Sequence, residues 1–206
     1  MKLARSVAIL VAAGLCASAC VQAHDKADTS ENTVAGKPVV AAEKPFAAGG
    51  KIDIQLEGGG YQVQAAADDR IRVTLSGNIG NAKVELAADG THADVKVKDT
   101  PNSNFHATIE VPKAADLVIR LSGGDLLMAP ITGNKDVEAY GGDIKIGVGD
   151  PNDYSSVDAS VKAGDINAGV FGGSKSGLLQ RFTWSGPGKY TLRASLGAGD
   201  FVLRSK

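Results

Sequence analysis

From residue 46 almost to the C-terminus, apolar and polar residues alternate with a period of two. Ile52, Ile54 and Leu56 alternate with charged or amide residues in the segment 51–57. Because successive side chains on a strand point to opposite faces, this alternation predicts half-buried β-strands. The pattern predicts further strands at 61–64, 70–75, 83–86, 94–98, 108–111 and 117–121.

The chain outside its first residues contains no stretch with the spacing of apolar residues that an amphipathic helix needs. Glycine makes up 26 of 206 residues, against an average of about 7%, and most glycines lie between the strand patterns. We therefore expect an all-β fold. Residues 46–206 are of the right length to form one domain.

A short phrase, in which a small residue precedes Gly-Asp and a short strand pattern follows, occurs four times in the second half of the chain. Its glycines are separated by 18, 22 and 35 residues. Similar phrases between short strands are typical of repeat architectures, in which each rung stacks on its neighbour. We expect a single-stranded β-solenoid or prism, with a β-sandwich as the alternative. The four phrases contain Gly124-Asp125, Gly142-Asp143, Gly164-Asp165 and Gly199-Asp200.

The longest interval between these phrases contains two further strand patterns, at 180–185 and 189–194. They flank Gly186-Pro187-Gly188. Because glycine adopts the backbone angles that a tight turn demands, this segment predicts a β-hairpin.

The N-terminus has the order of a secretory signal peptide: Lys2 and Arg5, then an apolar run, then small residues up to Ala23. The apolar run is too short to span a bilayer, which needs roughly 20 residues. Cleavage after Ala23 predicts a periplasmic or secreted protein. Alternatively, residues 17–20 resemble a lipobox, although the usual leucine is missing, and Cys20 would then be lipidated in an outer-membrane lipoprotein.

Residues 24–45 are polar and contain few large apolar side chains, so we expect a flexible tether with a marginal strand at 38–42. Without residues 1–23 the chain has 20 basic and 23 acidic residues, which are scattered. A nucleic-acid-binding domain usually has a basic stripe or patch, so nucleic acid is not an expected partner. No polybasic segment is available to anchor the chain to anionic lipid.

These features together resemble the bacterial putative-adhesin or "toast-rack" domains of the cell envelope, over roughly residues 46–204. The resemblance lies in the strands at 52–56 and 61–64 around Gly58-Gly59-Gly60, the segment 109–112 before the strand at 117–121, and the Gly-Asp phrases. It implies stacked short strands that form a β-solenoid or prism, without known activity and without catalytic residues. The stretched segment 171–196 departs from the usual pattern.

The histidines, His24, His92 and His106, have no familiar metal-ligand spacing, and no cofactor is expected. The repeated aspartates are weak Ca²⁺ candidates, because like charges in stacked rungs would repel. The alternative, which we favour, is that each aspartate caps its turn by accepting backbone N–H bonds. These weak candidates are Asp125, Asp143, Asp165 and Asp200.

Three aromatic residues, Phe182, Trp184 and Tyr190, lie close together in the predicted hairpin. If exposed, they would form a surface that stacks on a sugar or docks a partner. If buried, they would cover the end of the solenoid, and the low aromatic content of the chain favours this second interpretation.

The sequence therefore predicts a non-enzymatic, exported structural or interaction module, adhesin-like and of unknown specificity. Its expected partner is another envelope protein or a surface polymer. The alternative function is a polysaccharide-active enzyme, because parallel β-helices can carry paired carboxylates. Asp143 and Asp165 are its first candidate catalytic residues.

Overall fold

A computed structural model describes residues 37–205 of the chain. These residues form fifteen β-strands and two short 3₁₀ turns, with no α-helix among them. The predicted all-β fold is confirmed. The signal peptide, Cys20, His24 and the first part of the tether lie outside the described residues, so their assignments stay predictions.

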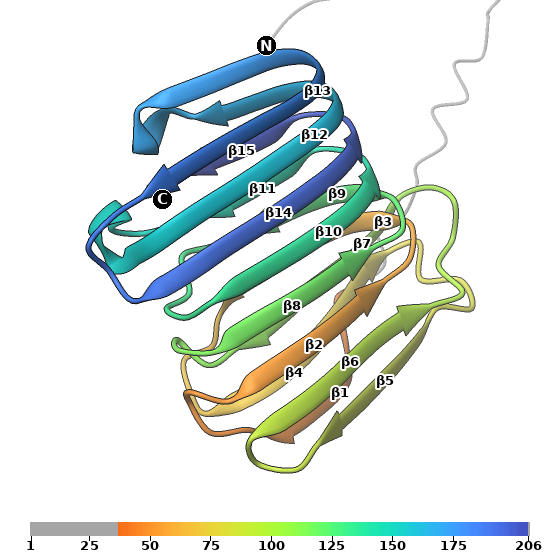
Figure 1. Ribbon diagram of the computed structural model, residues 1–206. Helices are drawn as coiled ribbons and strands as arrows, with labels where there is room; N and C mark the ends of the chain where they lie inside the picture. The colour runs from red at the N-terminus through yellow and green to blue at the C-terminus, as the bar shows by residue number, and fades with distance from the viewer. Residues whose placement is uncertain (1–36, 206) are drawn as a thin grey trace, which may run out of the picture. The chain divides into compact units, whose positions relative to one another are not determined.

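The strands form two layers that face each other (Figure 1). In spatial order, the first layer contains β5 (Lys83–Ala88), β6 (His92–Lys98), β2 (Lys51–Leu56), β8 (Asp116–Leu121), β10 (Lys135–Gly141), β14 (Tyr190–Ala198), and parts of β12 (Tyr154–Ala168) and β13 (Gly173–Ser185). The C-terminal end of β12 and the N-terminal end of β13 continue into the second layer. The second layer contains β1 (Val39–Pro45), β4 (Arg70–Gly77), β7 (Phe105–Val111), β3 (Gly59–Ala65), β9 (Gly124–Met128), β11 (Ile144–Gly147) and β15 (Phe201–Arg204).

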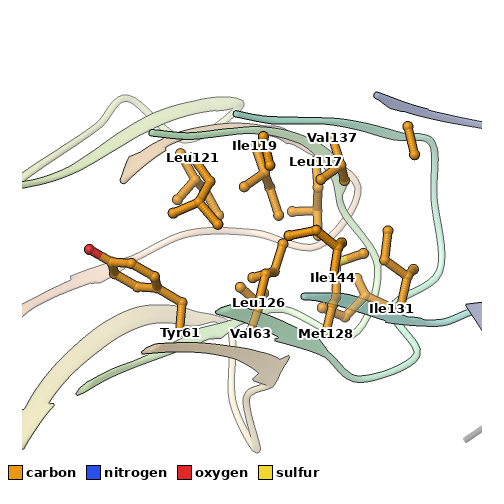
Figure 2. Packing of buried hydrophobic residues seen from close by; sticks show 14 of the residues in the cluster. Tyr61, Val63, Leu117, Ile119, Leu121, Leu126, Met128, Ile131, Val137 and Ile144 are labelled. Atoms are coloured by element: carbon orange, nitrogen blue, oxygen red, sulfur yellow. The ribbon is translucent and has the colours of Figure 1, made fainter. Parts of the chain in front are cut away.

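The hydrophobic core fills the space between the two layers. Figure 2 shows Leu117, Ile119 and Leu121 of β8 facing Tyr61 and Val63 of β3. All five side chains are buried. The period-two pattern produces this core because each strand directs its apolar residues inward and its polar residues to the outer surface.

Each rung consists of one strand in each layer, joined at a corner. Pairs such as β2–β3, β8–β9 and β10–β11 stack in parallel and in register. Strand β12 forms a rung by itself, since it pairs with β14 in its first part and with β15 near Ile166. This stacking of rungs is the solenoid arrangement that the Gly-Asp phrases predicted.

The rungs do not stack in the order in which the chain makes them. The β6–β7 rung pairs with the earlier β2–β3 rung, which then pairs with β8–β9. Likewise, β14 lies between β10 and the earlier strand β12. At both ends of the solenoid, the spatial order of the rungs therefore differs from their order in the chain.

The prediction of a hairpin between 180–185 and 189–194 is wrong, because these two segments do not pair with each other. Strand β13 pairs antiparallel with β12, and β14 pairs parallel with the opposite edge of β12, so β12 separates them. The connecting loop crosses the start of β12, where Gly188 N donates to Tyr154 O at 3.1 Å. A Cβ on Gly188 would overlap the backbone of Asp153. The glycine is needed for this close approach and not for a hairpin turn.

The ordered fold begins earlier than the predicted domain boundary at residue 46. Strand β1 lies in the segment assigned to the tether and pairs antiparallel with β4. Glu43 accepts from Arg70 at 2.8 Å and from Arg72 at 3.2 Å. The marginal strand expected at 38–42 therefore lies at Val39–Pro45 and covers an edge of the second layer.

Candidate functional site

The Gly-Asp phrases lie at the corners between the two layers, where glycines of successive rungs touch. Gly142 has a φ of 116°, in the region that favours glycine, and a Cβ there would overlap the carbonyl oxygen of Gly124. At Gly124, Gly199 and Gly164 a Cβ would likewise overlap the carbonyl oxygen of the glycine in the neighbouring rung, whereas at Gly59 it would overlap the ring of Phe105. In spatial order, the column contains Gly59, Gly124, Gly142, Gly199 and Gly164.

The four aspartates form a second column beside the glycines, in which three of the carboxylates accept a hydrogen bond from the next rung. Asp125 Oδ1 accepts from the backbone N of Asp143 at 3.0 Å, and Asp143 Oδ1 accepts from the backbone N of Asp200 at 3.4 Å. Asp200 Oδ1 in turn accepts from the backbone N of Asp165 at 3.2 Å. These hydrogen bonds give the aspartates a structural role as caps that connect neighbouring rungs.

This column separates the two residues that were the first catalytic candidates. Asp200 lies between Asp143 and Asp165, so these two residues are two rungs apart. Neighbouring rungs are spaced by about 4.8 Å. The Ca²⁺ candidates are the same four residues, and cation binding by them stays a prediction that a titration can test.

The aromatic residues at 182, 184 and 190 pack into the fold, and two of them contact other aromatic side chains. Phe182 is buried, and Trp184 packs on Phe171 with ring centroids 4.8 Å apart. Tyr190 packs edge-on against the buried Tyr154, with centroids 6.5 Å apart. Trp184 and Tyr190 are partly buried against the core. The three side chains therefore lie in the packed end of the fold and do not form the exposed stacking surface considered for them.

A different aromatic residue, Tyr140, lies on the outer surface of the first layer and is 76% exposed. It borders a hollow of about 390 Å³ at the ends of β2, β6, β8 and β10. We call this hollow, with the side chains that line it, the Tyr140 hollow. Its polar lining comes from Gln55, Glu57, Lys98, Arg120, Ser122 and Glu138.

Charged side chains on neighbouring strands hold Arg120 in this hollow. Arg120 lies between Asp136 and Glu138, with N–O distances of 3.0 Å to Asp136 and 3.3 Å to Glu138. The three residues belong to β8 and β10, which pair in parallel and in register. The guanidinium therefore lies at a fixed position beside the exposed ring of Tyr140, with Glu138 as a neighbouring hydrogen-bond acceptor.

The second layer has its own hollow, of about 420 Å³, where the column of aspartates ends. Gly60 takes the place of an aspartate in the β3 rung, since it pairs with Asp125 on one side and His106 on the other. The missing side chain leaves a depression lined by Gln62, His106, Asp125 and other residues. Among the described residues, no exposed phenylalanine, tyrosine or tryptophan lines this depression. A ligand there would be bound mainly through hydrogen bonds and charge.

Among residues 37–205, one group of three acid or histidine side chains has ligand atoms close enough together to hold a metal ion. It consists of Asp53, His92 and Asp94 on the outer surface of the first layer. The sequence did not indicate this group because its members come from strands that are separated by about forty residues in the chain.

Comparisons with known proteins give structural neighbours only. No protein-family model matches the chain, and no curated protein sequence matches it. A putative cell adhesion protein from Clostridium sporogenes is 13% identical, with a TM-score of 0.48, over 81% of this chain and 98% of its own. A putative adhesin from Bacteroides fragilis is 10% identical, with a TM-score of 0.27, over 82% of this chain and 97% of its own.

A third neighbour is a putative lipid binding protein from Parabacteroides distasonis. It is 14% identical, with a TM-score of 0.28, and covers 54% of this chain and 58% of its own. Two of these neighbours are described as a putative cell adhesion protein and a putative adhesin. Within residues 37–205, no helix has the length and apolar character that a membrane crossing requires.

The sequence contained a signal for Tyr140 that could have been used. In the segment 137–140, Val137 and Ala139 are apolar and inward-facing, and Glu138 is outward-facing. Tyr140 therefore occupies an outward position of a period-two strand. An aromatic residue on the polar side of such a strand indicates a binding surface more directly than the aromatic cluster at 182–190 does.

Proposed function

We propose that the protein is a non-enzymatic interaction module, adhesin-like, that is exported to the bacterial cell envelope. Its binding surface is the outer face of the first layer around the Tyr140 hollow, and its partner is a surface polymer. The observation that supports this proposal is the exposed residue Tyr140, which lines the same hollow as Arg120 and Glu138 over strands that pair in register.

The chemistry of this surface suits a polymer rich in hydroxyl or amide groups. An exposed aromatic ring offers an apolar face for stacking, at a low cost in side-chain entropy. Arg120, Glu138 and Gln55 offer hydrogen-bond donors and acceptors around the ring. Because the strands on both sides are paired in the sheet, the polar groups are held in place before the partner binds.

A co-sedimentation assay with purified envelope polymers tests the proposal. Isolated peptidoglycan and lipopolysaccharide vesicles serve as probes for the mature chain, for Tyr140→Ser and for Leu178→Ser. Leu178 is the matched control because its side chain is also 75% exposed, but it lies on β13, away from the hollow. We expect the wild type and Leu178→Ser to sediment with at least one polymer.

Tyr140→Ser should weaken that binding by about tenfold or more, as removal of a central interface tyrosine does. Equal binding of the two variants would show that the hollow is not the binding surface. Binding of the wild type to neither polymer would contradict the polymer assignment.

Export and processing belong to the same proposal and have their own test. Intact-mass measurement of the mature protein should give the mass expected for cleavage before His24. A mass that corresponds to a diacylated or triacylated chain beginning at Cys20 would instead establish the lipoprotein alternative.

A further inference from the structure

Asp53, His92 and Asp94 converge at one point on the outer surface of the first layer. Strands β2 and β6 run parallel, with Asp53 directly opposite Asp94 and Lys51 directly opposite His92. The pairing of these two strands therefore brings together two carboxylates and one imidazole on the same face of the sheet.

The contact distances show that all three groups meet. His92 Nε2 lies 3.3 Å from Asp53 Oδ2 and 3.5 Å from Asp94 Oδ2. The side chain of Asp53 is 22% exposed, so it is the most enclosed of the three. Like charges directly opposite each other on neighbouring strands destabilise a sheet, and a cation between the carboxylates relieves that repulsion.

We propose that Asp53, His92 and Asp94 form a binding site for a divalent transition-metal ion of the Zn²⁺ class. One imidazole nitrogen and two carboxylate oxygens are a donor set that suits Zn²⁺, whereas Ca²⁺ and Mg²⁺ take oxygen ligands alone. The three residues provide three ligands, so at least one position stays open to water or to an oxygen of a partner molecule.

Lys51 competes with the metal ion for one of the ligands. Its Nζ lies 3.0 Å from Asp53 Oδ2, the same oxygen that faces His92. A metal ion at the site takes over this oxygen, so the ammonium group must move away. Loss of the ammonium group is therefore expected to strengthen metal binding, which is the opposite of the effect of losing a ligand.

Isothermal titration of tag-free, EDTA-treated full mature chain with ZnCl₂ tests the site. We expect one high-affinity site in the wild type, and binding at least about tenfold weaker in His92→Gln, as loss of a ligand implies. Lys51→Gln should bind about two- to fivefold more tightly, which corresponds to the loss of one exposed ion pair. CaCl₂ should give no heat that depends on His92.

His106→Gln is the matched control, since it also removes one imidazole and leaves the three proposed ligands in place. This variant should not change the affinity for Zn²⁺. The proposal is overturned if the wild type gives no heat, if His92→Gln binds as tightly as the wild type, or if His106→Gln loses the site. Melting curves of the metal-free variants check folding, and Asp94→Asn replaces His92→Gln in the test if that variant does not fold.

Discussion

Leu179 has a left-handed backbone conformation, with a φ of 54°, although it is not a glycine. Its side chain is 82% exposed, so little packing offsets the steric cost. A left-handed conformation costs an L-residue about 1–2 kcal/mol, because Cβ approaches the following carbonyl oxygen. Leu179 is thus a strained position on β13, which has β12 as its one partner strand among the described elements.

We expect Leu179→Gly to raise the free energy of unfolding by about 0.5–1 kcal/mol, since relief of the strain exceeds the entropy that glycine loses on folding. Leu178→Gly is the control, because Leu178 is similarly exposed and does not have a positive φ. It should lower the free energy of unfolding. Urea denaturation measures both changes, and destabilisation of similar size in both variants would contradict this interpretation of Leu179.

Lys135 is a second unusual residue, because its side chain is buried at the end of the core. Its ammonium group donates to Ile131 O at 2.6 Å, to Gly133 O at 3.1 Å and to the hydroxyl oxygen of Tyr154 at 2.7 Å. Burial lowers the pKa of Lys135 to about 8, against the opposing effects of Asp116 and Asp153. The hydrogen bonds join the connection after β9 to the start of β12.

The lowered pKa of Lys135 predicts that stability rises with pH. Between pH 8 and 10.5, Lys135 is largely protonated in the unfolded chain but largely deprotonated in the folded chain. The free energy of unfolding therefore increases as the pH rises through this range. Relative to Lys135→Met, we expect the wild type to gain about 1–2 kcal/mol between pH 8 and 9.5. Urea denaturation at both pH values measures this difference, and parallel pH profiles for the two proteins would show that Lys135 does not titrate there.

Neither the left-handed backbone of Leu179 nor the burial of Lys135 could be predicted from the sequence. Lys135 begins a strand whose alternation would have suggested an apolar residue at this inward position, and its partners are carbonyls of a loop and a tyrosine of another rung. Local periodicity contains no information about such distant partners. By contrast, the burial of Ile52, Ile54 and Leu56 follows directly from the period-two pattern.

At the scale of strands and corners, the glycine column determines how closely successive rungs approach. We expect Gly142→Ala to lower the free energy of unfolding by about 3 kcal/mol or more, because the added Cβ overlaps Gly124 and the backbone has a positive φ. Gly141→Ala is the neighbouring control. A Cβ there meets Ala198 O at 3.6 Å, which is an ordinary contact. Thermal melting should separate the two variants clearly, and equal melting temperatures would contradict the role of the column.

The aspartate column has a separate prediction, which distinguishes caps from cation ligands. Asp143→Asn keeps an acceptor oxygen for the backbone N of Asp200 and removes one like charge, so stability should be unchanged or higher. Asp143→Ala removes the acceptor and should cost about 0.5–1 kcal/mol. Calorimetry of the EDTA-treated protein with Ca²⁺ should show no heat. An asparagine variant as unstable as the alanine variant, together with Ca²⁺ heat in the wild type, would support a cation column instead.

The strands could be predicted from the sequence, but the order of the rungs could not. Every rung has the same alternation, so the pattern does not distinguish one parallel neighbour from another. The positions of β6–β7 and of β14 are visible only in the strand pairing of the folded chain. The hairpin predicted at Gly186-Pro187-Gly188 is absent for the same reason. The turn residues predicted that β14 would lie beside β13, but β12 occupies that position.

At the scale of the described domain, the outer face of the first layer and the corners of the solenoid differ in the side chains that are available to bind a partner. The corner aspartates at positions 125, 143 and 200 bind backbone groups of the next rung. The outer face of the first layer instead has an exposed tyrosine, ion-paired side chains and the Asp53, His92 and Asp94 group. We therefore propose that this face binds the partner and that the corners have a structural role.

The most direct test of this assignment compares one face variant with one corner variant in the same polymer co-sedimentation assay. Tyr140→Ser should lose binding by about tenfold or more, whereas Asp143→Asn should bind like the wild type, with both variants melting within a few degrees of it. Retained binding by Tyr140→Ser together with lost binding by Asp143→Asn would contradict the account and place the binding site at the corners.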